Sequence, residues 1–287
     1  IWMDGSRRMA WLEDYAAAVN ETAQAPVPAT LTQGIRFDNV SFKYPGSEDN
    51  VLEDINLQLP VGSVVAIVGE NGAGKSTLVK LLCRMYQPGS GRIWLDDTNL
   101  ADVSAEQWRS RLAGAFQDFF RFEYNAGRSV GVGDVARLDD QPAVSSAVAR
   151  AGAEDVIAAL DSGLDAQLGP TWPQGVDLSV GQWQKIALAR GFMRDDPLLL
   201  VLDEPTAALD AETEHALFER YAENARSSGA DSRITVLVSH RFSTVRMADL
   251  IVVMDGARVV EVGDHDTLMA RDGQYAQLYR IQAEAYR

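Results

Sequence analysis

The sequence lacks several features that define whole classes of protein. It has a single cysteine, Cys83, so no internal disulfide can form, and the redox signal suits the cytoplasm. No stretch approaches the roughly 20 uninterrupted apolar residues that span a bilayer. Residues 1–20 carry charges throughout, unlike a secretory leader. The chain begins at Ile1 rather than Met, and we therefore expect a fragment or one part of a larger polypeptide.

Positive charge is also scarce. The 26 Lys and Arg residues face 41 Asp and Glu residues, which gives a formal net charge of −15. This balance disfavours a broad contact with the phosphates of DNA or RNA and flat binding to anionic lipid. It leaves room for a local cationic pocket that binds a nucleotide. The 287 residues, 46% of them hydrophobic, suffice for one large domain or two small lobes.

The first 30 residues differ in pattern from the rest. Trp11, Tyr15 and Val19 recur every four residues and predict a helix over residues 1–20. The Pro-containing segment at 25–29 then indicates a linker. This helix is either the tail of an upstream domain or an edge helix packed on its own domain. We expect a helix and linker over residues 1–30 and a single domain over residues 31–287.

Four short apolar runs each lead into a polar or glycine-rich segment. Such runs are typical of buried parallel strands joined by helical crossovers. In open α/β sheets, ligands bind at the carboxyl ends of the strands, so the segments beyond the runs are expected to converge on one edge. The runs are Ser63–Val68, Leu112–Phe116, Leu198–Leu202 and Ile234–Val238, and they lead into Gly69, Gln117, Asp203-Glu204 and Ser239-His240.

Other segments indicate the elements around this sheet. Alternation over residues 35–44 predicts a strand that ends at Pro45-Gly46. Residues 141–160 are Ala-rich and helical in character, within a helical lobe of about residues 118–190. Asp255-Gly256 predicts a hairpin between two apolar runs, and residues 274–284 predict a closing helix. Cys83 follows Leu81-Leu82, which favours a buried thiol.

The glycine-rich segment Gly69–Thr77 fits the phosphate-loop pattern G-x-x-x-x-G-K-[ST]. It follows an apolar strand and opens a helix-forming run, which is the context that the pattern requires. The glycines allow a tight turn that brings N–H groups near phosphate oxygens, and the helix N-terminus adds partial positive charge. Lys75 can reach the terminal phosphates, and the hydroxyl of Ser76 can bind Mg²⁺.

Two carboxylates follow the run at 198–202. Asp203 is suited to hold Mg²⁺, directly or through water. Glu204 is suited to orient or deprotonate the water that attacks the γ-phosphate. Taken alone, the pair could equally cap the segment at Pro205-Thr206, but the phosphate loop favours the catalytic interpretation.

The segment Leu178-Ser179-Val180-Gly181-Gln182 resembles the LSGGQ signature of ATP-binding-cassette (ABC) proteins. Over about residues 35–285, further motifs agree in order and spacing with that family. Tyr44 resembles the A-loop aromatic, Gln117 the Q-loop, Ala208-Leu209-Asp210 the D-loop and Ser239-His240-Arg241 the switch histidine segment. The resemblance implies an α/β fold, a P-loop NTPase with a parallel core sheet, an antiparallel β subdomain and a helical signature subdomain.

The resemblance also implies the roles of individual residues. Catalysis would use Glu204, His240, Gln117 and Lys75, and Mg²⁺ would be held by Ser76, Gln117 and Asp203. ATP would be bound by Tyr44, Gly69, Asn71, Gly72, Ala73, Gly74, Lys75, Ser76, Thr77, Ser179, Gly181 and Gln182. Simpler interpretations stay open: an ordinary strand aromatic for Tyr44, a strand cap for Gln117, a satisfied strand-end histidine for His240 and a helix N-cap for Asp210.

The signature implies a second copy or a related chain. Ser179 is expected to cap a helix that runs towards Arg194 and, in the family, faces the ATP held by the other subunit. Two chains would sandwich two ATPs head to tail. Val180 replaces the first signature glycine and would be strained only if that position needs a positive φ. Thr171–Gly175 replaces an acidic stretch common in exporters, so the contacts of that loop are not carried over.

The segment after His240 resembles the end of an exporter-type half-transporter, in which membrane helices precede the ATPase domain in one chain. We therefore expect a motor domain of an exporter at the cytoplasmic face of the inner membrane. Its partners would be a transmembrane domain and a second ABC ATPase domain, with no nucleic acid. A separate importer subunit and a non-transport ABC ATPase are the alternatives. Residues after Gln117 would either receive a coupling helix or form core: Phe119, Phe120, Phe122 and Tyr124.

Overall fold

The computed structural model describes residues 25–204, 233–239 and 241–285. Three of the expectations concern residues outside these ranges. The helix predicted over residues 1–20, the D-loop segment at 208–210 and His240 lie outside the described residues. The predicted division of the chain between residues 30 and 31 stays a prediction.

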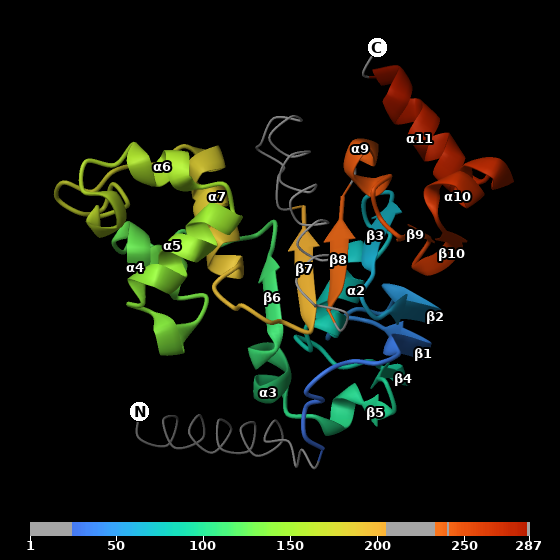
Figure 1. The fold of residues 1–287 in the computed structure, drawn as a ribbon. Coiled ribbons are helices and arrows are strands. Elements are labelled where there is room, and N and C mark those ends of the chain that lie inside the picture. Colours follow the sequence, from blue (N-terminus) through green and yellow to red (C-terminus); the bar gives the residue numbers. More distant parts are fainter. Residues whose placement is uncertain (1–24, 205–232, 240, 286–287) are drawn as a thin grey trace, which may run out of the picture.

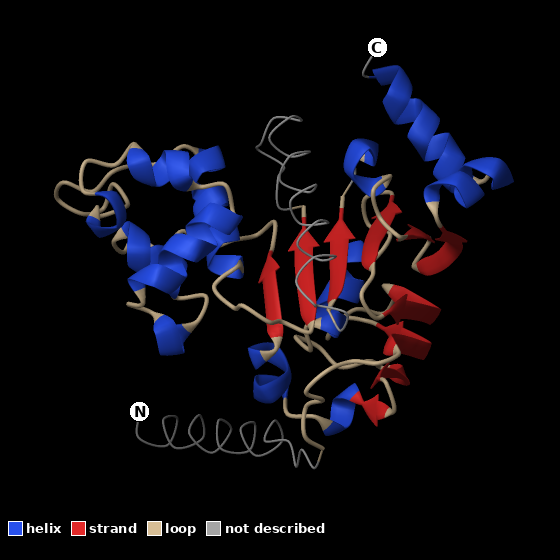
Figure 2. Ribbon diagram, in the orientation of Figure 1, coloured by secondary structure: helices blue, strands red, loops and turns tan. Residues whose placement is uncertain are grey.

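An antiparallel sheet forms the first layer (Figure 2). Its order is β2-β1-β4-β5, and β1 pairs with β2 on one side and with β4 on the other. Strand β2 alternates buried and exposed residues along nearly its whole length, as expected for a sheet with one wet face. The strands are β1 (Gly34–Phe42), β2 (Leu52–Pro60), β4 (Ser90–Leu95) and β5 (Thr98–Asn99).

The second sheet holds the four predicted runs side by side. Its order is β10-β9-β3-β8-β7-β6, and every pairing is parallel except that of β9 with β10. All residues of β7 and β8 are buried, as the uninterrupted apolar runs predict. The arrowheads of β6, β7 and β8 point the same way (Figure 1). The strands are β3 (Val64–Gly69), β6 (Leu112–Ala115), β7 (Leu199–Asp203), β8 (Ile234–Val238), β9 (Leu250–Asp255) and β10 (Arg258–Gly263).

A helical lobe lies beside β6, to the left in Figure 1. It contains α4 (Ala126–Gly131), α5 (Gln141–Arg150), α6 (Glu154–Ala158) and α7 (Val180–Gly191). Residues 141–160, expected to be helical in character, form two helices, because Gly152 adopts a left-handed conformation with φ of 61° and ends the first. The fold class predicted from the sequence is confirmed.

The remaining helices border the sheets. Helix α2 (Lys75–Leu82) follows the phosphate loop, and α3 (Ala105–Ser110) precedes β6. The C-terminal part has α9 (Phe242–Val245), α10 (His265–Arg271) and α11 (Gln274–Ala285). Short 3₁₀ turns occur at Leu100–Asp102, Val135–Arg137 and Gly163–Asp165. Among the described residues, no helix is long and apolar enough to cross a bilayer.

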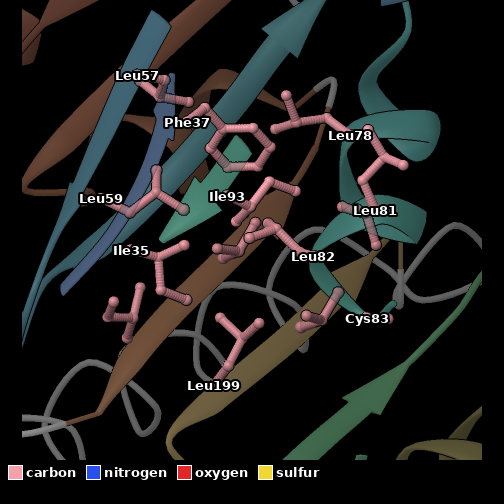
Figure 3. Close-up of a cluster of buried hydrophobic side chains, with 14 of the residues drawn as sticks. Ile35, Phe37, Leu57, Leu59, Leu78, Leu81, Leu82, Cys83, Ile93 and Leu199 are labelled. Carbon is pink, nitrogen blue, oxygen red and sulfur yellow. The ribbon is translucent and has the colours of Figure 1, made fainter. Parts of the chain in front are cut away.

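Apolar side chains of the two sheets and of α2 share one core (Figure 3). Phe37 and Ile93 of the antiparallel sheet, Leu78 of α2 and Leu199 of β7 all belong to it. Cys83 is buried there as predicted, and burial raises the pKa of its thiol to about 12. This core fixes α2, and with it the phosphate loop, against the parallel sheet.

The hairpin predicted at Asp255-Gly256 is present, but its turn is shifted by one residue. Asp255 still belongs to β9 and pairs with Arg258, so Gly256 and Ala257 form the turn. Both have positive φ, 50° and 69°, the combination that a two-residue turn between twisted strands requires.

Candidate nucleotide-binding site

The phosphate loop between β3 and α2 has a backbone that only glycine allows at its key positions. Gly69, Gly72 and Gly74 have φ of 148°, 85° and 100°. A Cβ on Gly69 would lie 2.2 Å from the carbonyl oxygen of Met254, and one on Gly74 would lie 2.7 Å from that of Val51. The sequence pattern is therefore matched by a turn that excludes side chains.

Lys75 opens α2 and has its ammonium held within the loop. Its Nζ donates to the carbonyl oxygens of Gly69 and Glu70, both at 2.9 Å. Burial lowers the pKa of Lys75, while the charges of Glu204 and Asp203 act in the opposite direction. Gly74 precedes α2 without a side-chain cap hydrogen bond, so the first N–H groups of the helix are available to an anion.

The predicted carboxylates stand at the carboxyl end of β7, next to the loop. The hydroxyl of Ser76 donates to Oδ1 of Asp203 at 3.4 Å, and Asp203 is only 6% exposed. Desolvation raises the pKa of Asp203, although the Ser76 hydrogen bond acts against the shift. Glu204 has a positive φ of 45°, and its N–H donates to the carbonyl of Val238 at the end of β8.

These groups suit a hard cation. Carboxylate and hydroxyl oxygens are the ligands that Mg²⁺ prefers, and it is usually held by one or two protein groups together with substrate phosphates. Ser76 and Asp203 bring such oxygens within hydrogen-bond distance of each other. A cation would also offset the desolvation of the buried Asp203. In the described part of the chain, no cluster of three or more His, Cys, Asp or Glu side chains offers a metal site made from protein alone.

Tyr44 lies beside the helix that follows the loop. Its hydroxyl shares a hydrogen bond of 3.0 Å with the hydroxyl of Thr77. Its half-buried ring meets the rings of Phe42 and Tyr86 edge-on, at centroid distances of 5.1 and 5.2 Å. Nζ of Lys80 lies 5.7 Å from the ring centroid. The aromatic side chain is thus joined to α2, which the sequence pattern alone did not predict.

Gln117 follows β6, which pairs with β7 at the edge of the sheet. Its side chain is exposed. Because β6 and β7 are parallel neighbours, Gln117 and Asp203 both lie at the carboxyl edge of the sheet. His240 follows β8 in the chain but lies outside the described residues.

The signature-like segment begins α7 with a reciprocal cap. The N–H of Gln182 donates to Oγ of Ser179 at 3.3 Å, and Oε1 of Gln182 accepts the N–H of Ser179 at 2.9 Å. Val180 is the first helical residue, 55% exposed and without positive φ, so the valine is unstrained. Gly181 follows within the first turn. The helix ends at Gly191, a little before the predicted Arg194.

Comparison with known proteins identifies the family. The family model for ABC transporters matches residues 52–207, more than half of the chain. The chain belongs to the ABC transporter family. The match includes the phosphate loop, the signature and the two carboxylates at the carboxyl end of β7.

Two relatives in this family are named as a multidrug export protein and as a lipid A-core flippase. A lipid A-core flippase of Chromohalobacter salexigens is 40% identical over 256 residues, which are 89% of this chain and 42% of that protein. YgaD of Bacillus subtilis, named for multidrug export, is 39% identical over 250 residues, 87% of this chain and 41% of that protein. The chain thus spans about two fifths of the length of these relatives.

A solved structure has the same fold. A bacterial Atm1-family ABC exporter with ATP bound superposes with a TM-score of 0.80 at 34% identity. The superposition covers 98% of this chain and 48% of the exporter chain. The predictions of an ABC fold and of an ABC ATPase domain are therefore confirmed.

Within this ABC domain, the signature helix lies away from the phosphate loop. Helix α7 packs on α4, α5 and β6, on the opposite side of β6 from α2 (Figure 1). The described hydrogen bonds of Ser179 are with Gln182 and Trp183 of its own helix. One chain thus brings Lys75, Ser76, Asp203 and Glu204 together but does not add Ser179 to them.

A groove of about 410 Å³ separates α7 from the segment after β6. Phe116, Phe119, Phe120, Phe122 and Arg190 are among the residues that line it. The aromatic residues divide between the two interpretations left open by the sequence. Phe119 packs against the core of the helical lobe, whereas Phe120 is 69% exposed and Tyr124 49% exposed.

Two residues that the motifs did not mark, Arg190 and Ser129, form hydrogen bonds to residues 120–122, which we call the groove wall. Arg190 of α7 donates from Nε to the carbonyl of Ser129 and from Nη1 to that of Phe120, both at 2.9 Å. Burial lowers the pKa of Arg190 to about 10, so the guanidinium is charged at neutral pH. Ser129 donates to the carbonyl of Phe122 at 2.7 Å. An Arg three turns into an amphipathic helix gave no signal that distinguished it from a solvated charge.

Proposed function

We propose that this chain is the ATP-hydrolysing motor domain of an exporter. The observation that carries the proposal is the meeting of Lys75 and Ser76 with the buried Asp203 and its neighbour Glu204 at the carboxyl edge of the parallel sheet. A charged donor, a hydroxyl and two carboxylates at a glycine-lined turn suit phosphoryl transfer to water. The named exporters among its relatives support the direction of transport.

Each residue has a physical task in this proposal. Lys75 gives up its hydrogen bonds to two carbonyl oxygens of its own loop and binds the terminal phosphates instead. The free N–H groups of α2 donate to the same phosphates. Glu204 orients the attacking water and accepts its proton. Tyr44 stacks on the adenine, and Thr77 contacts the phosphates beside it. His240 would contact the γ-phosphate from the end of β8.

Mg²⁺ fits the same edge. Ser76, Asp203 and Gln117 would hold it, the first two as hydroxyl and carboxylate ligands and Gln117 from the segment after β6. When bound, the ion neutralises charge on the β- and γ-phosphates. Asp203 would thereby be kept ionised in spite of its burial.

Two copies of the domain complete the site. The hydroxyl of Ser179 accepts a hydrogen bond from Gln182, which leaves its own proton to donate to a phosphate of the partner's ATP. Gly181 and Gln182 lie in the same first turn of α7. The helix N-terminus favours that negative charge. Binding of two ATPs would close a head-to-tail dimer, and loss of the γ-phosphates would reopen it.

The second partner in the proposal is a transmembrane domain, which would place this chain at the cytoplasmic face of the inner membrane. The exposed Phe120 at the groove supports a docking role for that surface, because apolar side chains that gather at a groove mark binding sites, whereas single ones do not. The two named relatives differ in their cargo, so the cargo is chosen outside this domain.

The size and location of the native polypeptide test the proposal. An antibody to this domain should detect a membrane-bound band at about double the 31.3 kDa of this chain. A membrane-bound band near 31.3 kDa would instead favour a separate importer subunit. A wholly soluble band would contradict a transport role and revive a non-transport ABC ATPase.

A further inference from the structure

Arg190 joins three parts of the helical lobe through one side chain. It belongs to α7, and its guanidinium bonds the carbonyl of Phe120 on the groove wall and the carbonyl of Ser129 in α4. Planar guanidinium donors reach two acceptors in fixed directions, which an ammonium does not. The side chain therefore sets the distance between α7, α4 and the groove wall at once.

The guanidinium of Arg190 also makes a contact that is not a hydrogen bond. Nη2 of Arg190 is buried and has no hydrogen-bond partner among the described residues. The guanidinium carbon lies 4.5 Å from the ring centroid of Phe122, within the range of a cation–π contact. The face of Phe122 thus receives the charge, and a second groove residue is bound to α7.

Ser129 reinforces the same connection. Its side chain is fully buried and donates to the carbonyl of Phe122. Behind it, Gly133 approaches so closely that a Cβ there would lie 1.9 Å from the carbonyl oxygen of Arg190. The groove wall, α4 and α7 are therefore closely packed against one another at this point.

The other end of α7 carries the signature. Ser179 lies about three turns, or roughly 16 Å, from Arg190 along the same helix. A continuous helix of this length moves as a rigid rod. A displacement of the groove wall is consequently passed to Ser179, provided that Arg190 holds the wall to the helix.

We propose that Arg190 is a positioning residue that makes the groove wall at Phe120–Phe122 and the signature helix one rigid unit. This inference rests on the proposed function, in which a segment of the transmembrane domain seats in the groove and Ser179 serves the partner's ATP. Movement of that segment then moves the signature directly. Arg190 contacts neither ATP nor the cargo in this role.

The test uses the full-length protein in lipid nanodiscs and compares five forms. These are wild type, Arg190→Met, Arg190→Lys, Ser129→Ala and, as a matched control, Arg128→Met. Arg128 is an exposed arginine of the same lobe that pairs with Asp139 at 2.8 Å. For each form, kcat and KM for ATP hydrolysis, the thermal midpoint and the hydrogen exchange of residues 118–124 are measured.

A mispositioned signature should lower kcat and spare nucleotide binding. For Arg190→Met we expect kcat to fall about 10- to 100-fold with KM for ATP nearly unchanged, because a shift of about 1 Å remote from the chemistry has that effect. Arg190→Lys should recover part of the loss and Ser129→Ala should lose less. Exchange of residues 118–124 should rise in Arg190→Met, and Arg128→Met should match wild type.

A second comparison separates positioning from general destabilisation. If Phe120 acts on the signature through Arg190, the effects of Phe120→Ala and Arg190→Met on cargo transport are not additive in the double variant. Additive losses, or a folded Arg190→Met with wild-type kcat and wild-type exchange, would overturn the proposal. Should Arg190→Met fail to fold, Ser129→Ala and Arg190→Lys decide by the same criteria. Wild type without ATPase activity would refute the proposed function, and exchange would still decide whether Arg190 holds the wall.

Discussion

Replacement of Tyr44 tests the adenine-stacking role separately from the contact seen in the structure. Tyr44→Ala removes the ring, and Tyr44→Phe removes only the hydroxyl that meets Thr77 at 3.0 Å. Stacking of a base on an aromatic side chain contributes roughly 1–3 kcal/mol by alanine substitution. Loss of the ring should therefore raise the Kd for ATP about 5- to 150-fold.

The hydroxyl should matter far less. A neutral hydrogen bond contributes about 0.5–1.5 kcal/mol net, and the half-buried site lets water replace the lost partner of Thr77. We expect Tyr44→Phe to raise the Kd by less than about threefold. ATP binding is measured by titration calorimetry in a Glu204→Gln background, with Tyr86→Phe as a control that removes a hydroxyl from the same aromatic cluster.

Two results would refute this reasoning. Wild-type affinity in Tyr44→Ala would return Tyr44 to an ordinary strand aromatic. Equal losses in Tyr44→Phe and Tyr44→Ala would show that the hydroxyl, acting through Thr77, carries the effect and that stacking does not.

Three further predictions concern stability, the signature and coupling. Partial burial acts to raise the pKa of Asp96, but hydrogen bonds from the N–H groups of residues 32–34 outweigh burial, and the pKa is lowered. The ionised carboxylate of Asp96 therefore stabilises the folded state above pH ~4, and this stabilisation is lost as the pH falls through the folded pKa. Asp96→Asn, which tolerates the positive φ of 50° at this position, should therefore cost about 1 kcal/mol in urea unfolding at pH 7 and little at pH 2, and an equal cost at both would contradict this. Val180→Gly should change kcat less than about threefold, since Val180 is unstrained, and a larger gain in ATPase assays would show that the valine impairs the partner's site. Phe120→Ala should reduce cargo transport while ATPase activity and the thermal midpoint persist, and loss of folding would instead favour a core role.

The sequence predicted the parts of the site that depend on local pattern. The glycines of the phosphate loop and the apolar runs before Gln117 and Asp203 are each readable within about ten residues, and the parallel sheet brings their ends to one edge. The cap at Ser179 was also predictable, because its partner Gln182 is three residues away.

Other features depend on contacts that the pattern does not contain. Strand β2 and strand β4 were not predicted, since short strands with one wet face give a weak signal between stronger motifs. The break at Gly152 was hidden by the Ala-rich composition on both sides. Arg190 and Ser129 meet across 61 residues of chain, and only the packing of α4 on α7 reveals them.

The central claim is that Glu204 activates water at a site built by the phosphate loop and the end of β7. The measurement is ATP turnover and ATP binding by the full-length protein with Glu204→Gln, beside the exposed control Glu106→Gln. We expect Glu204→Gln to bind ATP as wild type does and to hydrolyse it roughly 10²- to 10⁴-fold more slowly. Near-normal hydrolysis in Glu204→Gln would contradict the account and remove Glu204 from the mechanism.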